Sequence, residues 1–370
     1  MSVPVLFLIF NRPETTGQVF AAIREARPER LYIAADGPRP RKEGEDALCA
    51  RTRRIAQEVD WPCEVKTLFR KRNLGCALAV SSAVTWFFRQ ESEGVILEDD
   101  VLPHPDFFYF CAELLARYRN TPEVMLISGN NFQLGLQRGE ASYYFSRFPH
   151  IWGWASWARA WKFFDLSMPG FGGFMRAPAL WPTDIPEIKY HWQLLQAALD
   201  GRIDTWDCAW AYAIFRQNGL SALPNHNLAR NIGFGGGTNC LGQSIWDYAR
   251  TQPMPQLRHP VAIQADRAAD DFSARVCWPP PAMQMEAIMR EATRRLESGE
   301  ARANEELLLM ARKFYGNLYI LAYLETLTTA ALGNSSQAME LAEKLLRDWP
   351  REARADVLLP QVAGILRKNM

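Results

Sequence analysis

Three adjacent carboxylates, Glu98, Asp99 and Asp100, directly follow the apolar residues 94–97. Like charges at the end of a buried strand destabilise it unless a cation compensates them. Alternate residues of a strand share a face, so Glu98 and Asp100 can point the same way. A hard divalent ion such as Mg²⁺ or Mn²⁺ binds one or two carboxylates together with diphosphate oxygens. The triplet therefore predicts a metal–diphosphate site; the alternative is a solvated acidic turn.

Polar residues also follow two earlier apolar runs. Phe10, Asn11 and Arg12 close the first run, and Asp36 closes the second. An arginine can pair with a phosphate, and Asp36 can accept hydrogen bonds from a nucleobase. We assign all four residues to a candidate nucleotide site. Asn-Arg-Pro and Asp-Gly are also ordinary turn sequences, which is the simpler interpretation of either motif alone.

Two loops are candidates for contact with such a ligand. Asn73 ends the basic run 70–72 just before a Gly-containing turn, where the backbone can approach phosphates closely; a solvated charge run is the alternative. The segment 231–238 (NIGFGGGT) is glycine-rich and predicts a cover that folds over a bound ligand.

Asp207 is the candidate general base. It lies between Trp206 and Trp210, which share one face of a helix, and a carboxylate among aromatic rings suits proton abstraction. A helix cap or a surface aspartate is an equally simple interpretation. Asp165 is a second candidate with poorer surroundings.

Tryptophan is concentrated in one part of the chain. Of the 13 tryptophans, eight fall within 152–210. An indole ring offers a flat face to a sugar, so Trp152, Gly153, Trp154 and Trp206 are candidate acceptor-binding residues. Such rings are nonetheless more often part of a core.

The elements that position these residues alternate between strands and helices over 1–127. Short apolar runs end at turn residues, and amphipathic helical patterns separate them. This order predicts an α/β fold with a mostly parallel sheet and flanking helices. Ligands bind outside the carboxyl ends of such strands, which is where the candidate residues lie.

The composition changes at about residue 281. Residues 282–370 contain one tryptophan and long amphipathic patterns, and 317–350 resembles a single tetratricopeptide-type helix pair. We therefore expect a domain over 1–280, and the family resemblance given below implies its division into a nucleotide-sugar half (1–127) and an acceptor half (128–280). A helical extension over 281–370 follows, as a candidate site for a protein partner or for homo-oligomer formation; a stabilising cap is the alternative.

Composition excludes several classes of protein. The chain has 370 residues, a formal net charge of +1, 48 % apolar and 22 % charged residues, which is typical of a soluble globular protein and not of a nucleic-acid binder. The longest apolar run, 5–10, is too short to span a membrane. The seven cysteines are odd in number and well separated, so we expect neither a CxxC zinc site nor a disulfide framework, and a cytoplasmic location.

Taken in order, these segments resemble a known family. FNRPETTGQVFAAI, LYIAADGPR, NLGC, VILEDDVLPHPDFFYFCAELLARY, ISGNNF, WGWASWARAW, TWDCAW and NIGFGGGT occur as in GT-A-type glycosyltransferases. The closest groups are the bacterial hemolytic-protein-HlpA-like nucleotide-diphospho-sugar transferases and the N-acetylglucosaminyltransferase I family. The resemblance covers roughly residues 3–275 and implies the Rossmann-like GT-A fold.

The resemblance implies a metal-dependent transferase with a nucleotide-diphosphate sugar, by preference a UDP-sugar, as donor. In that family Asp100 matches the ligand of Mn²⁺ or Mg²⁺. Glu98 and Asp99 match positions facing the ribose and sugar, while Arg12 and Asp36 match positions that hold the phosphates and the base.

The same resemblance makes Asp207 the general base of an inverting reaction on a glycan acceptor, in the expected case a bacterial surface glycan. One departure is Cys208, where the N-acetylglucosaminyltransferase pattern has a second acidic residue. Two other functions stay open: a non-catalytic protein that binds carbohydrate or nucleotide sugar, and a sugar nucleotidyltransferase. The latter usually needs a Gly-rich basic loop after the first strand, which this chain lacks.

Overall fold

A computed structural model describes residues 2–233, 244–350 and 352–368. The chain divides into two compact units, each built from more than one stretch of sequence. The first unit comprises 1–131, 138–242 and 250–274, and the second comprises 132–137, 243–249 and 275–370. The second unit thus includes two short segments that precede the boundary expected at 281.

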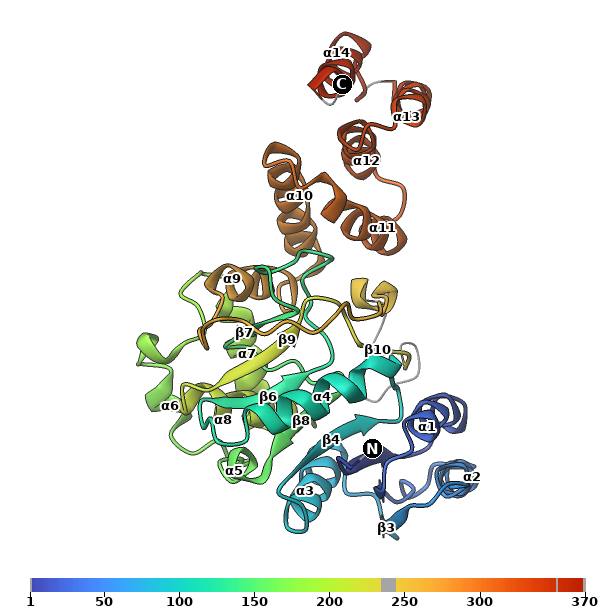
Figure 1. Cartoon of the computed structure of the whole chain (residues 1–370), viewed down its shortest axis with the longest axis vertical. Helices are drawn as coiled ribbons and strands as arrows, with labels where there is room; N and C mark the ends of the chain where they lie inside the picture. The colour runs from blue at the N-terminus through green and yellow to red at the C-terminus, as the bar shows by residue number, and fades with distance from the viewer. Residues whose placement is uncertain (1, 234–243, 351, 369–370) are drawn as a thin grey trace. The chain divides into compact units, whose positions relative to one another are not determined.

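The first unit is built on an eight-stranded sheet with the order β3-β2-β1-β4-β8-β6-β9-β7 (Figure 1). Its strands are β1 (Val5–Ile9), β2 (Arg30–Ala35), β3 (Glu64–Phe69), β4 (Glu93–Glu98), β6 (Val124–Ser128), β7 (Tyr143–Ser146), β8 (Trp154–Trp157) and β9 (Leu220–Pro224).

The sheet is mostly parallel, as the alternation of strands and helices predicts. β3, β2, β1 and β4 run parallel to their neighbours, and so do β6 and β9. β8 is antiparallel to both β4 and β6, and β7 is antiparallel to β9. The carboxyl ends of β1, β2 and β4 therefore meet at one edge.

Helices cover both faces of this sheet. Their bounds are α1 (Pro13–Ala26), α2 (Glu45–Ala56), α3 (Cys76–Phe88), α4 (Pro105–Arg117), α5 (Ala158–Trp161), α6 (Phe171–Phe174), α7 (Ile188–Leu199), α8 (Asp207–Arg216) and α9 (Arg267–Val276). α1 begins at a proline, whose fixed φ suits the first helical position, and α4 begins at Pro105 in the same way.

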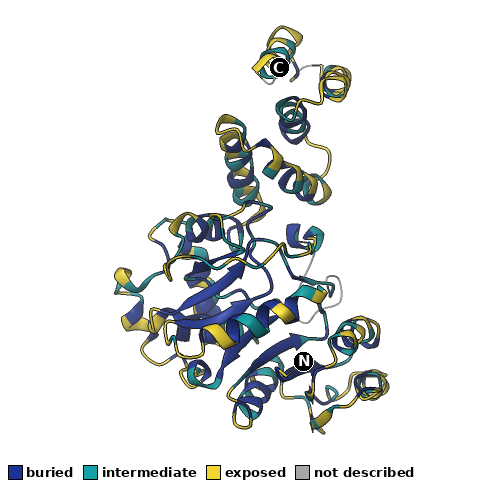
Figure 2. Cartoon of the chain, in the orientation of Figure 1, coloured by how far each residue is buried: buried dark blue, intermediate teal, exposed yellow. Residues whose placement is uncertain are grey.

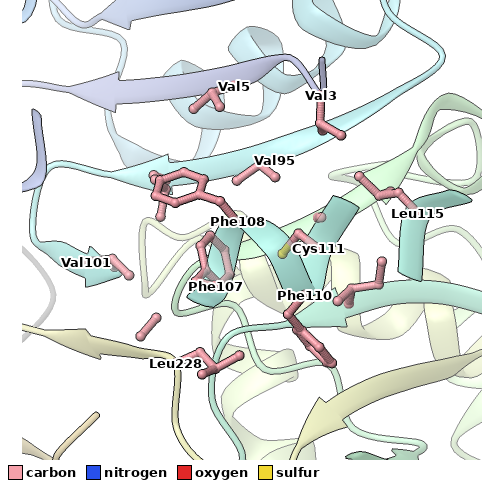
Figure 3. Close-up of a cluster of buried hydrophobic side chains, with 14 of the residues drawn as sticks. Val3, Val5, Val95, Val101, Phe107, Phe108, Phe110, Cys111, Leu115 and Leu228 are labelled. Carbon is pink, nitrogen blue, oxygen red and sulfur yellow. The ribbon is translucent and has the colours of Figure 1, made fainter. Parts of the chain in front are cut away.

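Alternate side chains of the strands enter two separate cores, because successive residues of a strand point to opposite faces. Val5 and Phe7 of β1 join the core beneath α1 and α4, whereas Leu6 and Leu8 join the core beneath α3, α5 and α8. Figure 3 shows part of the first core, where the aromatic side chains of α4 lie beside residues of β1 and β4. In Figure 2 the strands other than β3 are mostly buried, whereas β3, at the edge of the sheet, is exposed or half-buried.

A small antiparallel pair forms a second sheet in this unit. β5 (Val101–Pro103) follows the acidic triplet and pairs with β10 (Ala229–Asn231). This pairing brings the start of the glycine-rich segment next to Asp100, since the Ile232 amide donates a hydrogen bond to the Asp100 carbonyl (2.7 Å).

The second unit is helical. Its helices are α10 (Pro281–Glu297), α11 (Asn304–Tyr315), α12 (Tyr319–Ala331), α13 (Ser335–Asp348) and α14 (Ala355–Lys368). α12 and α13 form within the two halves of the expected helix pair, and together with α14 they enclose a core of alanine, leucine and valine side chains.

A buried arginine explains why 132–137 belongs to this unit. The Arg295 side chain is 0 % exposed. Its guanidinium donates hydrogen bonds to Glu291 Oε1 (2.9 Å) and to the carbonyls of Leu134 (3.2 Å) and Ala303 (2.6 Å). A buried charge is stable only when it is paired and hydrogen-bonded in this way.

No helix within the described ranges is both long and apolar enough to cross a membrane.

Candidate functional site

A cavity of about 340 Å³ lies at the carboxyl edge of β1, β2 and β4. The predicted site residues that line it are Phe10, Arg12, Asp36, Asn73, Glu98, Asp99, Asp100, Trp152, Trp206 and Asp207. Asn11, Gly153 and Trp154 are not part of its lining. Residues from the first, second and fourth strands thus come together with residues more than 100 positions later in the chain.

The acidic triplet forms one wall of this cavity. Glu98 is the last residue of β4, and the two aspartates form the turn before β5. Asp99 accepts a hydrogen bond from the Phe10 amide (2.9 Å), which ties the turn to the end of β1. Asp100 forms a salt bridge and hydrogen bond with the guanidinium of Arg12, whose Nη1 also lies 3.9 Å from Asp99 Oδ1.

Carboxyl groups outnumber cationic groups around the triplet. Burial raises the pKa of Glu98 well above its ordinary value and that of Asp99 to about 7, and the charge of Asp100 adds to both shifts. Burial by itself would lower the pKa of Arg12, but the charges of Asp100 and Asp99 outweigh it and raise that pKa. Three carboxylates therefore share one arginine.

The donor set fits a hard divalent cation, which prefers carboxylate oxygens. Nevertheless, the described residues contain no group of three His, Cys, Asp or Glu side chains placed to hold a metal ion. A cation at Asp100 would therefore need further oxygen ligands from a bound molecule. Mg²⁺ is usually bound in this way, by one or two carboxylates together with substrate phosphates.

Asp36 lines the cavity, so its contact with a nucleobase stays a prediction, and its carboxylate also has partners within the protein. Its carboxylate is buried and accepts hydrogen bonds from the amides of Gly37 (2.8 Å) and Leu74 (2.9 Å) and from Asn73 Nδ2 (2.9 Å). Burial raises the pKa of Asp36, while these hydrogen bonds act against the rise. Asp36 therefore holds the 73–75 loop against β2, and Asn73 is committed to the same network.

Asn11 differs from its predicted role, because its amide contacts a buried carboxylate and not the cavity. Asn11 Nδ2 donates a hydrogen bond to Glu45 Oε1 (2.8 Å). Arg39, in the preceding loop, donates hydrogen bonds to the same carboxylate. Burial would raise the pKa of Glu45, but the Arg39 hydrogen bonds lower it to about 2. The Arg39 guanidinium also stacks on Phe10, 5.5 Å from the ring centroid, and lines the cavity.

Arg39 and Glu45 are thus site residues that sequence reasoning missed. Arg39 lies in the polar loop before α2 and Glu45 is the first residue of that helix, and only the fold shows that Arg39 reaches the cavity. From the basic run, Arg70 also lines the cavity and donates to Ser82 Oγ (2.7 Å), whereas Lys71 and Arg72 are exposed.

Among the tryptophans, Trp152 is the one that is partly exposed and lines the cavity. Trp154 is 1 % exposed and stacks on Trp206, 5.6 Å between ring centroids, within a core that also contains Trp161 and Trp210. The predicted role of Trp154 as a sugar platform is therefore wrong.

Trp206 and Gly153 both have structural roles in place of the predicted acceptor contacts. Trp206 is 2 % exposed, so it reaches the cavity only with a small part of its surface. Gly153 has a φ of +65°, and its carbonyl accepts a hydrogen bond from the Gly129 amide (2.6 Å), so it serves the turn before β8. Glycine adopts this φ at little cost.

Asp207 lines the same cavity and is the first residue of α8. Its Oδ1 accepts hydrogen bonds from the Thr205 hydroxyl and from the Cys208 amide (2.9 Å). Both bonds fix the orientation of the carboxylate. The Cys208 side chain is buried, and burial raises the pKa of its thiol, with the charge of Asp207 adding to the rise.

Asp204 is another residue that sequence reasoning missed. Its carboxylate accepts hydrogen bonds from the amides of Cys76 (2.7 Å) and Ala77 (2.9 Å), the first residues of α3. A carboxylate is favourable at a helix N-terminus, where backbone N–H groups lack partners. Asp204 therefore joins the loop that carries Asp207 to the helix that follows the Asn73 loop.

Two other predictions have clear outcomes. Asp165 lies outside the cavity lining, is exposed, and accepts hydrogen bonds from the amide and hydroxyl of Ser167. Of the predicted cover 231–238, residues 234–238 lie outside the described residues. Gly233 is described, and its backbone packs directly on Asp100 and Arg12.

No protein-family model matches the chain, and no curated protein sequence is significantly similar to it.

Proposed function

We propose that the chain is a metal-dependent glycosyltransferase of the GT-A type, which transfers a sugar from a nucleotide-diphosphate donor to an acceptor hydroxyl with inversion. The observation that carries the proposal is the composition of one cavity. Arg12, the Glu98–Asp100 triplet and a hydrogen-bonded carboxylate, Asp207, all line it.

On the donor side, Arg12 pairs with diphosphate oxygens, and the loop that Asp36 organises holds the nucleoside. Asp100 is the residue that would hold a divalent cation, with Glu98 and Asp99 beside it. When bound, such a cation supplies positive charge that stabilises the diphosphate leaving group. We favour a UDP-sugar because of the family resemblance.

On the acceptor side, Trp152 offers a partly exposed indole for a sugar ring. Thr205 and the Cys208 amide hold Asp207 through Oδ1, so the proton passes to Oδ2. The acceptor oxygen loses its proton to Asp207 and forms a bond to the anomeric carbon. The bond from that carbon to the diphosphate oxygen breaks, and its electron pair leaves with the diphosphate, where Arg12 stabilises the charge.

In the proposed reaction a single base acts from the side opposite the leaving group, which gives inversion at the anomeric carbon. A retaining reaction would need a nucleophile on the donor side, and the proposal assigns no residue to that role. The glycan acceptor, a cytoplasmic location and a partner for the helical unit belong to the same proposal. The burial of Trp154, Trp206 and Trp210 disfavours a purely carbohydrate-binding protein, because those rings are not available to a sugar.

The test is a panel of nucleotide-diphosphate sugars, each measured with Mn²⁺ for binding and for slow hydrolysis. We expect one nucleotide to bind and Asp100→Ala to weaken that binding about tenfold or more, as expected when a metal ligand is lost. Asp207→Asn should leave donor binding unchanged and lower transfer by a factor on the order of 10² or more.

Asp165→Asn is the matched control, since it removes an exposed carboxylate outside the cavity. It should change neither binding nor transfer. Absence of binding for every nucleotide would refute the transferase proposal, and sugar binding without nucleotide binding would favour a carbohydrate-binding protein instead.

A further inference from the structure

The pairing of Arg12 with Asp100 has a consequence for how a cation reaches the site. Asp100 is the carboxylate proposed to hold the cation, yet its Oδ2 is already bound to the Arg12 guanidinium. The two side chains are only 22 % and 15 % exposed, so water screens the pair less than it would screen a surface pair.

The surrounding residues hold this pair in place. Arg12 is the residue immediately before α1, and Asp100 lies immediately before β5. The Gly233 backbone covers both side chains: a Cβ at that position would lie 2.3 Å from Asp100 Oδ2 and 2.7 Å from Arg12 Nη1. The Ile232 amide fixes the backbone of Asp100 at the same place.

The groups around the pair favour competition between Arg12 and a divalent cation for the Asp100 carboxylate. Arg12 also lies near Asp99, and Glu98 is a third carboxyl group at the same place. A divalent cation at Asp100 would compete with the guanidinium for the same oxygen and would meet its positive charge at short range. An anion that binds the guanidinium would free the Asp100 oxygen and would neutralise the positive charge that repels the cation.

We infer that Arg12 is the resident counter-ion of Asp100 and makes cation binding depend on an anionic diphosphate. In the free protein Arg12 keeps the cation out. A diphosphate draws Arg12 onto its own oxygens, releases Asp100, and supplies the oxygens that the carboxylates do not. The protein thus takes up the cation together with the diphosphate. The inference rests on the proposed function only in naming a diphosphate as the anion.

The test measures Mn²⁺ alone, by electron paramagnetic resonance of free Mn²⁺ during titration of the full chain without nucleotide. Wild-type protein should bind weakly, and Arg12→Met should bind at least about tenfold more tightly, because it removes the competing charge. Arg70→Met is the matched control: it removes the same charge from another cavity arginine that contacts Ser82 and not Asp100. It should change Mn²⁺ affinity less than about threefold.

The double variant Arg12→Met, Asp100→Asn shows whether the tighter site is Asp100, and it should return to the weak wild-type affinity. Equal Mn²⁺ affinities for Arg12→Met and Arg70→Met, with both variants folded by circular dichroism, would overturn the inference. Should Arg12→Met not fold, Arg12→Gln, which keeps a hydrogen-bond donor without the charge, takes its place.

A second measurement uses UDP as the probe. In wild-type protein, UDP should raise Mn²⁺ affinity and Mn²⁺ should raise UDP affinity by the same factor, since coupling is reciprocal. In Arg12→Met that factor should fall towards one. A factor as large as that of wild type would overturn the inference. If UDP and other nucleoside diphosphates do not bind at all, the proposed function fails, while the Mn²⁺ comparison still decides the role of Arg12.

Discussion

Gly233 occupies a position where a larger residue does not fit. A Cβ on Gly233 would lie 2.3 Å from the Asp100 side chain. A Cβ on Gly17, inside α1, would have no other described side chain or backbone segment within 4 Å. The two glycines therefore separate the effect of close approach from the general effect of replacing glycine by alanine.

We predict that Gly233→Ala lowers the free energy of unfolding by about 1–3 kcal/mol, the usual cost of overpacking. Gly17→Ala should raise it by about 0.5–1 kcal/mol, because alanine is the better helix former and has less freedom in the unfolded chain. Urea denaturation of both variants measures the difference. Equal effects would mean that the Gly233 backbone is free to move away from Asp100.

Residue types alone indicated part of the site. Arg12 and the triplet 98–100 were predictable because charged side chains directly follow apolar strands, and parallel strands bring their ends together. The roles of Asn11 and Asp36 were not, because their partners, Glu45 and the amide of Leu74, lie more than 30 positions away. A polar side chain that binds the protein and one that binds a ligand have the same local sequence.

At the scale of elements, α3 depends on a residue 128 positions from its start. Gly75 precedes the helix with a φ of +80°, and a Cβ there would lie 2.5 Å from Asp204 Oδ2. The Asp204 carboxylate thus caps the helix from another part of the chain, with two backbone amides as donors.

Removal of this cap should destabilise the protein moderately. We expect Asp204→Ala to lower the free energy of unfolding by about 1–2 kcal/mol and Asp204→Asn to lower it by less, because the amide keeps one acceptor. Asp200→Ala, which removes an exposed carboxylate paired with Arg202, should cost under about 0.5 kcal/mol. Thermal or chemical denaturation measures all three, and equal losses at positions 200 and 204 would contradict a capping role.

The elements of the sheet were predictable to different degrees. β1, β2 and β4 consist of mainly apolar runs closed by turn residues, which indicates buried strands, whereas β3 is a more polar strand at the edge of the sheet. β7 and β8 have four residues each and follow irregular segments, so their pattern is too short to identify. Their antiparallel placement beside β9 and β4 depends on pairing between distant segments, which local sequence does not encode.

At the scale of the whole molecule, stability should depend on pH through Asp270 in the first unit. Asp270 is buried and accepts hydrogen bonds from the Ser146 hydroxyl and the Arg147 amide. Burial raises its pKa to about 7; the hydrogen bonds and the charge of Arg147 oppose the rise, and Asp266 adds to it. The folded state therefore binds this proton more tightly than the unfolded state, whose aspartate has an ordinary, lower pKa.

Linkage then gives the sign. Stability contributed by this proton is fully present below the unfolded pKa and is lost as pH rises to about 7. We predict that the free energy of unfolding falls less between pH 5 and pH 8 in Asp270→Asn than in wild-type protein. Denaturation curves at several pH values measure both slopes. Parallel slopes would show that Asp270 does not titrate in this range.

The tryptophan-poor tail was predictable as helical from its periodicity, but its full extent was not. Segments 132–137 and 243–249 belong to the same unit, and nothing in their sequences indicates it. Phe132 and Trp246, from these two segments, lie 4.6 Å apart between ring centroids.

Arg295 therefore sets an order of events during synthesis. Its carbonyl partner at Leu134 leaves the ribosome 161 residues before Arg295 does, because synthesis runs from the N-terminus. For that interval the early segments have no helical partner, and the interior of the tail is incomplete. A ribosome stalled before residue 295 should carry a nascent chain whose 132–137 segment a protease cuts, and release of the full chain should end that sensitivity.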